Sequence, residues 1–316
     1  MNIITKSNSD RRRIAAVGMY DGVHLGHRFL IDYLRAEAKA RSLVPSVVTF
    51  SRHPLALVRP LEAPGLLTTL EERVKYLEDA GIEDTILLSF NDKIRYMSAR
   101  EFLSMLHKKY GIDALVVGFN NRFGHDRLEG FEQYKAIGKE LGMDVINAPE
   151  YGGPAAPISS SIIRKYLLKG QPDKAYEALG HPYSLRGVVV DGNRLGRTIG
   201  FPTANIVPVD SASIVPKSGA YAAFVITPDG VRRKAIVNIG FRPTVADENV
   251  SGKLSIEAHI LDYVGYLYDE EVVIEFVKYL RPEKKFSSTA KLQEQLTADA
   301  NAAKKQLTID NFSIDS

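Results

Sequence analysis

The fold of the first half of this chain is decided by one stretch, Ile14-Ala15-Ala16-Val17-Gly18-Met19-Tyr20-Asp21-Gly22-Val23-His24-Leu25-Gly26-His27. Its first four residues are apolar, as in a short strand that is buried on both faces, and a helix is expected to follow the second histidine. A helix N-terminus presents free N–H groups and partial positive charge, which makes it a phosphate site. The stretch therefore predicts a strand, a turn and a helix, with an anion site at the turn.

Short apolar segments and amphipathic segments alternate through the rest of the first half. The expected strands are residues 14–17, 46–50, 85–88, 114–117 and 144–148, and the expected helices are residues 29–39, 69–79, 99–109 and 131–140. This order is typical of an α/β doubly wound, Rossmann-like domain with a parallel sheet. Ligands bind such sheets at the carboxyl ends of the strands.

The second half has a different period. Two short helices are expected at residues 161–169 and 172–179, and beyond Pro182 the apolar residues recur at every second position, as in residues 254–260. Several short strands between Gly/Pro turns then predict a small antiparallel β-barrel. A final helix from about residue 288 places Leu292, Leu296, Ala300 and Ala303 on one face. We therefore expect two domains, residues 1–182 and 183–316.

The composition is that of a globular protein without extreme charge. The chain has 316 residues and a net charge of +3, which gives no reason to expect a nucleic-acid partner. It has no cysteine, which excludes disulfides, thiolate metal sites and a cysteine nucleophile. No apolar run approaches the ~20 residues of a membrane span, and the N-terminus lacks a signal-peptide core. We expect a cytoplasmic protein without a membrane partner, and we predict no particular oligomeric state.

His24 and His27 form an H-x-G-H pattern at the first strand–helix turn. Histidines at such a turn can donate to charge that builds on a reacting phosphoryl group. A zinc site is the alternative, but no third ligand lies at short spacing. The chain holds neither a G-x-x-x-x-G-K-[ST] loop nor a G-x-G-x-x-G after a strand. The first domain therefore fits a nucleotidyltransferase better than a dehydrogenase.

Three serines, Ser159 to Ser161, open the helix that carries Arg164. Helix capping alone explains one or two of these hydroxyls. Three hydroxyls and an arginine suit a triphosphate clamp, because arginine supplies directional donors and a fixed charge.

The barrel half begins with Gly192, Gly196 and the run Gly200-Phe201-Pro202-Thr203-Ala204-Asn205. Thr203 and Asn205 share one face of extended backbone, and their neutral oxygens can hold a Mg²⁺ that carries a nucleotide phosphate. Glycines suit a loop whose backbone comes close to a ligand. The alternative is an ordinary start of a strand with Ser/Thr/Asn capping. Glu257, farther along, can accept a hydroxyl proton or lie on the solvated face of its strand.

The motifs occur in the order of a known family. They are Gly22-Val23-His24-Leu25-Gly26-His27, Thr49-Phe50, His53-Pro54, Val117-Gly118, Arg122-Phe123-Gly124, Ser159-Ser160-Ser161, Ile163-Arg164, Gly187, Gly192, Gly196, Gly200 to Asn205, Asn238-Ile239-Gly240, Pro243-Thr244, Ile256-Glu257-Ala258-His259 and Leu280-Arg281. The chain resembles the prokaryotic bifunctional riboflavin kinase/FMN adenylyltransferases, or bifunctional FAD synthetases, over nearly its whole length.

This resemblance implies two reactions. The barrel would use ATP to phosphorylate riboflavin to FMN, and the N-terminal domain would adenylylate FMN with a second ATP to give FAD and pyrophosphate. The site residues that the resemblance implies are Thr203 and Asn205 for Mg²⁺, Gly192, Gly196 and Gly200 for the kinase nucleotide, Glu257 as base, and Gly22, His24, Gly26, His27, Asn120, Ser160, Ser161 and Arg164 for the adenylyltransferase nucleotide.

The chain departs from the family pattern at three places. Tyr20 stands where Phe is common, Ser161 replaces a Thr, and Phe119-Asn120-Asn121 lacks the usual acidic first and aromatic third residues. The altered loop supports one alternative, a riboflavin kinase with a degenerate, regulatory nucleotidyltransferase domain. A second alternative is a flavin-storage protein, although binding flavin alone requires neither the H-x-G-H pattern nor Glu257.

Overall fold

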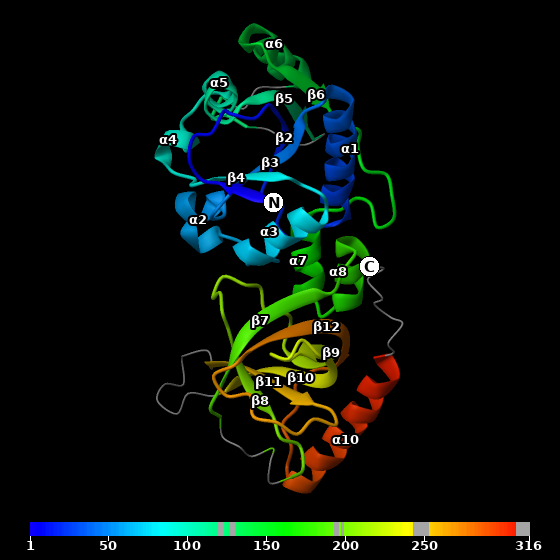
Figure 1. Ribbon diagram of the computed structural model, residues 1–316. Coiled ribbons are helices and arrows are strands. Elements are labelled where there is room, and N and C mark those ends of the chain that lie inside the picture. The colour runs from blue at the N-terminus through cyan, green and yellow to red at the C-terminus, as the bar shows by residue number, and fades with distance from the viewer. Residues whose placement is uncertain (119–122, 127–129, 193–195, 197–198, 243–252, 308–316) are drawn as a thin grey trace. The chain divides into compact units, whose positions relative to one another are not determined.

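The computed structural model describes residues 1–118, 123–126, 130–192, 196, 199–242 and 253–307 (Figure 1). The contacts of the chain divide it into two units. Unit 1 is Met1–Pro64 with Thr68–Ser159, and unit 2 is Gly65–Leu67 with Ser160–Ser316. The helices α7 (Ser160–Leu168) and α8 (Pro172–Leu179) are thus grouped with the barrel. The domain boundary at residue 182 stays a prediction about separable activities.

Unit 1 is built on a six-stranded parallel sheet with the order β1-β4-β3-β2-β5-β6. The strands are β1 (Asn2–Ile4), β2 (Arg13–Val17), β3 (Val44–Phe50), β4 (Asp84–Leu88), β5 (Ile112–Val117) and β6 (Asp144–Asn147). The helices are α1 (Leu25–Arg41), α2 (Pro54–Val58), the 3-10 turn η1 (Pro60–Glu62), α3 (Leu70–Asp79), α4 (Asp92–Arg95), α5 (Ala99–Tyr110) and α6 (Phe131–Leu141). The predicted doubly wound parallel sheet is confirmed.

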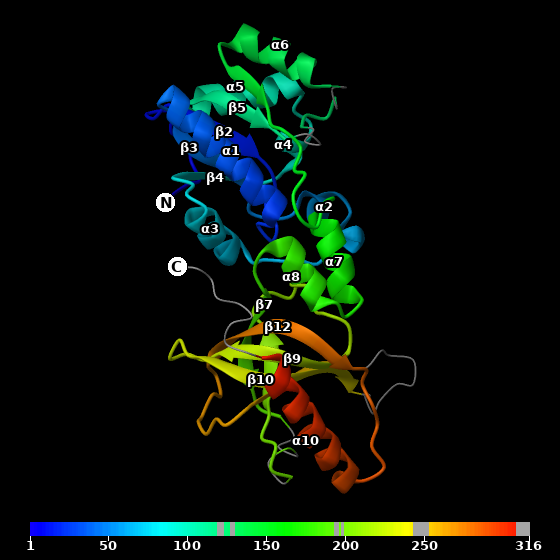
Figure 2. The ribbon, with the colours of Figure 1, turned by 90° about the vertical axis from the view of Figure 1, so that its right-hand side faces the viewer.

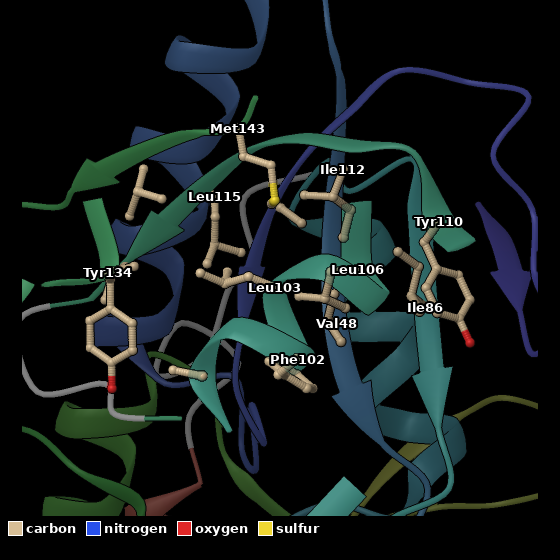
Figure 3. Close-up of a cluster of buried hydrophobic side chains, with 14 of the residues drawn as sticks. Val48, Ile86, Phe102, Leu103, Leu106, Tyr110, Ile112, Leu115, Tyr134 and Met143 are labelled. Carbon is tan, nitrogen blue, oxygen red and sulfur yellow. The ribbon is translucent and has the colours of Figure 1, made fainter. Parts of the chain in front are cut away.

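Both faces of this sheet are covered, which explains the continuous apolar runs of its strands. Ile14 and Ala16 of β2 pack with Leu34 of α1 on one face. Ala15 points to the opposite face and packs with Phe102 of α5. Figure 3 shows the core on that second face, where side chains from α5 meet those of the strands.

Helix α1 begins at Leu25, several residues before the predicted start. The reason is the cap: His24 has extended backbone, and its Nδ1 accepts the His27 N–H at 3.2 Å. A histidine in this place does what Ser, Thr or Asp usually does at an N-cap. The H-x-G-H pattern therefore lies on the helix's first turn rather than on the loop before it.

Unit 2 contains a closed antiparallel barrel with the strand order β10-β11-β8-β7-β12-β9. The strands are β7 (Tyr183–Val190), β8 (Ala204–Pro208), β9 (Gly219–Ile226), β10 (Arg232–Arg242), β11 (Lys253–Ile260) and β12 (Glu271–Arg281). Buried and half-buried residues alternate along β7, as the period of two predicts. The predicted antiparallel barrel is confirmed.

The C-terminal helix α10 (Thr289–Gln306) lies along the barrel in both views (Figures 1 and 2). Ala300 and Ala303 pack against Phe224 and Ile236 of the barrel wall. In the same part of the helix, the Arg281 guanidinium of β12 donates to both carboxylate oxygens of Asp299, with distances of 2.7 to 3.1 Å. Apolar packing and this nearly buried ion pair fix the helix against the barrel.

Candidate active sites

The H-x-G-H turn of unit 1 brings two imidazoles together. The His24 and His27 rings stack with centroids 3.6 Å apart and an interplanar angle of 14°. Because Nδ1 of His24 accepts a backbone N–H, neutral His24 carries its proton on Nε2. Burial, with smaller contributions from His24 and Arg73, holds the pKa of His27 well below the usual histidine value. The His27 ring can therefore act as a neutral hydrogen-bond donor at neutral pH.

These histidines line a cavity of about 270 Å³ in unit 1. Its wall also includes Gly18, Gly26, Gly118 and Tyr151. The cavity lies at the carboxyl ends of β2 and β5, where a doubly wound sheet binds its ligands. The N-terminus of the 17-residue helix α1 adds partial positive charge. This arrangement suits a ligand that carries phosphates.

The barrel brings Thr203, Asn205 and Glu257 together. Strands β8 and β11 pair with Asn205 opposite Glu257. The Thr203 hydroxyl donates to Glu257 Oε2 at 3.4 Å, and the Ser255 hydroxyl donates to Oε1 at 3.1 Å. His259 Nδ1 donates to the Pro202 carbonyl at 2.8 Å, which ties the loop before β8 to β11. Two motifs that are far apart in the sequence are therefore neighbours in the barrel and form one candidate site.

Two cavities adjoin this group. One has a volume of about 220 Å³ and is lined by Phe201, Thr203, Glu257, Phe286 and, from α10, Leu292 and Leu296. The other has a volume of about 320 Å³ and is lined by residues that include Thr203, Tyr263 and Tyr268. Thr203 lines both, so a ligand in one cavity can meet a ligand in the other beside Glu257.

Sequence comparisons identify a different enzyme family for each half of the chain. Residues 6–162 match the FAD synthetase family, and residues 179–307 match the riboflavin kinase family. The chain is 34% identical over 293 residues to the bifunctional riboflavin kinase/FMN adenylyltransferase of Escherichia coli (strain K12), which covers 92% of each chain. The protein of the same name from Bacillus subtilis (strain 168) is 32% identical over 303 residues, again 92% of each chain.

This chain belongs to the bifunctional riboflavin kinase/FMN adenylyltransferase family. Because both family matches are present, the two-enzyme interpretation is favoured over a kinase with a degenerate regulatory domain. It is favoured over a storage protein too, because the curated relatives are enzymes.

A solved structure shares the fold across both units. It is named a macrolide-efflux protein from Streptococcus pneumoniae, with a TM-score of 0.85 and 29% sequence identity. The match covers 96% of this chain and 98% of that one. Within the part of the chain that the structure describes, no helix is both long and apolar enough to cross a membrane.

The remaining residues predicted for the adenylyltransferase site of this family member lie on α7 or outside the described residues. Ser160 is the first residue of α7, and Ser161 is exposed. Arg164 is buried and donates from Nε to the Gly65 carbonyl at 2.6 Å. Asn120 lies outside the described residues. For all four, a role in nucleotide binding stays a prediction.

The kinase glycines have close neighbours in the chain itself. A Cβ on Gly192 would overlap the Asn205 side chain, and a Cβ on Gly196 would overlap the Phe201 carbonyl. Gly200 has a φ of 79°, in the left-handed region that favours glycine. The Phe201 carbonyl explains glycine at position 196 and the positive φ explains it at position 200, whereas the Asn205 side chain beside Gly192 can move. Contact of the three glycines with a nucleotide stays a prediction.

Sequence reasoning missed a buried network beneath the H-x-G-H turn. Asp21 accepts two hydrogen bonds from Thr68, from its backbone N–H at 3.0 Å and its hydroxyl at 3.2 Å. The same hydroxyl accepts the Gly22 N–H at 3.1 Å. Thr68 was hidden because it precedes the capping box of α3, formed by Thr69 and Glu72, and so reads as part of a helix start.

Proposed function

We propose that the barrel of this chain phosphorylates riboflavin to FMN and that its α/β unit adenylylates FMN to FAD, each with one ATP. The observation that carries the kinase assignment is the position of Thr203 in the walls of two cavities, hydrogen-bonded to Glu257. A bisubstrate reaction needs two pockets that meet at the transferring group.

The smaller cavity is the better one for riboflavin. It contains Glu257 beside the aromatic Phe201 and Phe286 and the apolar side chains of α10, which suit a flat ring system. The larger cavity shares Thr203, is lined by two tyrosines and does not include Glu257. We assign it to ATP.

In the kinase step, Glu257 accepts the proton of the riboflavin 5′-hydroxyl. The hydroxyl oxygen then forms a bond to the γ-phosphorus of ATP, and the bond from that phosphorus to the bridging oxygen breaks, so that the electron pair leaves with ADP. No covalent enzyme intermediate is required, because positioning and charge neutralisation suffice for phosphoryl transfer.

The donor set at this junction fits Mg²⁺. Thr203 Oγ1, the Asn205 amide oxygen and the nearby Glu257 carboxylate are all oxygen ligands, which Mg²⁺ prefers. Thr203 and Asn205 would hold the ion together with the ATP phosphates. Bound there, the ion would neutralise charge on those phosphates.

The adenylyltransferase step makes a different demand. The nucleophile is the FMN phosphate, which is already anionic, so no base is needed; its oxygen bonds the ATP α-phosphorus while pyrophosphate leaves. His24 and His27 donate to the phosphate oxygens from the first turn of α1. Gly22 and Gly26 in the turn, and Asn120, Ser160, Ser161 and Arg164, complete the proposed nucleotide contacts.

We place both reactions in the cytoplasm, where ATP is supplied, with riboflavin, FMN and ATP as the small-molecule substrates. The test is to incubate the protein with riboflavin, ATP and Mg²⁺ and to separate riboflavin, FMN and FAD. FAD is the expected product. FMN alone would leave only the kinase assignment, and unchanged riboflavin would refute both assignments.

A further inference from the structure

Arg73 of α3 connects the ends of two strands in unit 1. Its side chain is buried, and its two terminal nitrogens donate to backbone carbonyls, Nη1 to Met19 at 3.0 Å and Nη2 to Phe50 at 2.7 Å. Met19 follows β2 in the turn that leads to the histidines, and Phe50 is the last residue of β3. One planar fork thus holds the carboxyl ends of two adjacent parallel strands.

The charge of Arg73 is not held in a direct ion pair by the described residues, and Asp21 acts on it only from a longer distance. Among the described residues it forms no ion pair, and its Nε has no hydrogen-bond partner. Burial lowers the pKa of this guanidinium, and Asp21, the anion that acts on it, opposes the shift. A buried cation held only by carbonyls is unfavourable unless an anion balances it.

The position of this charge indicates a second anion, besides Asp21, that can balance it. Arg73 acts electrostatically on His27, whose pKa its positive charge helps to lower. Met19 and His27 both line the unit 1 cavity, whereas Arg73 does not. The guanidinium therefore lies behind the wall of the site, close enough to act on charge inside it and too deep to touch a ligand.

We infer that Arg73 is a positioning residue of FMN adenylylation, which fixes the turn after β2 and supplies buried positive charge that favours nucleotide phosphates in the His24–His27 cavity. This inference rests on the proposed adenylyltransferase function. The hydrogen-bonding geometry and the positive charge of Arg73 can be tested separately, because only arginine has the planar fork and lysine keeps the charge.

The test compares Arg73→Lys with Arg73→Met in the full chain. Arg73→Met should lower kcat/KM for ATP in FAD formation by about 100-fold, the typical loss when a preorganised group is removed. Arg73→Lys should keep the KM for ATP within about threefold, because charge persists, yet lose kcat, because one ammonium group cannot reproduce the fork. Lys75→Met, an exposed change on the same helix, is the matched control and should leave both constants unchanged.

Circular dichroism and thermal unfolding of each variant report whether unit 1 is folded, because FMN formation by the barrel is expected to continue even when unit 1 is not. If Arg73→Met fails to fold, the KM-against-kcat split in Arg73→Lys decides alone. Near-normal FAD formation in a folded variant would overturn the inference. So would an equal fall in kcat and an equal rise in the KM for ATP in Arg73→Lys and Arg73→Met. The rise in melting temperature caused by inorganic pyrophosphate gives a readout that needs no turnover. If the wild type binds pyrophosphate but makes no FAD, the proposed function is wrong. The role of Arg73 is then still tested, because Arg73→Met should lose that rise in melting temperature.

Discussion

Replacing Glu257 with Gln tests the proposed base of the kinase step directly. The change removes the ability to accept a proton and keeps the shape. In the structure, Oε1 and Oε2 each accept one hydroxyl, from Ser255 and Thr203. The new amide can keep both contacts, because one hydroxyl can rotate to accept instead of donate. The expected change in the free energy of unfolding is therefore about 1 kcal/mol or less.

The kinetic effect should be much larger than this. Loss of a positioned base slows a reaction by about 10² to 10⁴, which corresponds to about 2.7 to 5.4 kcal/mol of barrier. Adenylylation of supplied FMN should be unchanged, because that reaction needs no base in the barrel. The expected mutant is thus folded, active as an adenylyltransferase and nearly inactive as a kinase.

The assay is riboflavin-to-FMN turnover at saturating ATP and Mg²⁺, with thermal unfolding measured in parallel. The matched control is Glu271→Gln, the same substitution in the same barrel, at a carboxylate that pairs with Arg186. Its turnover should be normal. If Glu257→Gln is folded and its rate of FMN formation is within a few-fold of the wild-type rate, Glu257 is not the base and only lies on the solvated face of β11.

Three further predictions concern other parts of the chain. His27→Ala should slow FAD formation from FMN by about 10² to 10³, the cost of one preorganised donor, while FMN formation continues; equal loss of both would point to unfolding. Tyr20→Phe should raise the melting temperature, because the Tyr20 hydroxyl is buried without a hydrogen-bond partner in the described part of the chain. The control, Tyr134→Phe, removes a hydroxyl that donates to the Phe123 carbonyl at 3.0 Å, and it should lower the melting temperature. If the melting temperature falls in both variants, the Tyr20 hydroxyl does have a partner. A cut near residue 182 should leave two separable activities, and a folded 183–316 piece that makes no FMN would refute an autonomous kinase barrel. A piece that begins at residue 160 should have a higher melting temperature than the 183–316 piece, because α8 packs on β7 and β12.

The sequence predicted the elements with strong periodicity and missed those held by distant partners. The apolar runs of β2 to β6 and the alternation in β11 are local signals of burial on two faces and on one. Strand β1 was missed because it has three residues, and its pairing with β4, more than eighty residues away, leaves no local pattern. Likewise, Leu66 exchanges backbone hydrogen bonds with Ala212 and Ile214 of unit 2, which no spacing in residues 60–70 indicates.

In the candidate sites too, residue types could be predicted from the sequence, whereas arrangements that depend on distant partners could not. Glu257, Thr203 and Asn205 were each recognisable by residue type, but only the β8–β11 register brings them together. Arg73 was read as one residue of an amphipathic helix, where an arginine is ordinarily on the solvated side. Its burial depends on two carbonyls at strand ends, and carbonyls carry no sequence signal.

The nucleophiles of the two proposed reactions differ in charge, which accounts for the difference between the side chains of the two candidate sites. Riboflavin has a neutral hydroxyl that must lose a proton, so the kinase reaction needs a base beside the reacting oxygen, and we propose the Glu257 carboxylate for this role. FMN arrives with an anionic phosphate that must approach another anion, the ATP triphosphate. Of the described wall of that cavity, the part next to α1 presents the imidazoles of His24 and His27, and Glu150 is the carboxylate that also lines it. Fixed positive charge then has to come from behind the wall, from the helix N-terminus and from Arg73. The proposed base in one unit and the proposed buried cation in the other thus follow from the charges of the two nucleophiles, a neutral hydroxyl and an anionic phosphate.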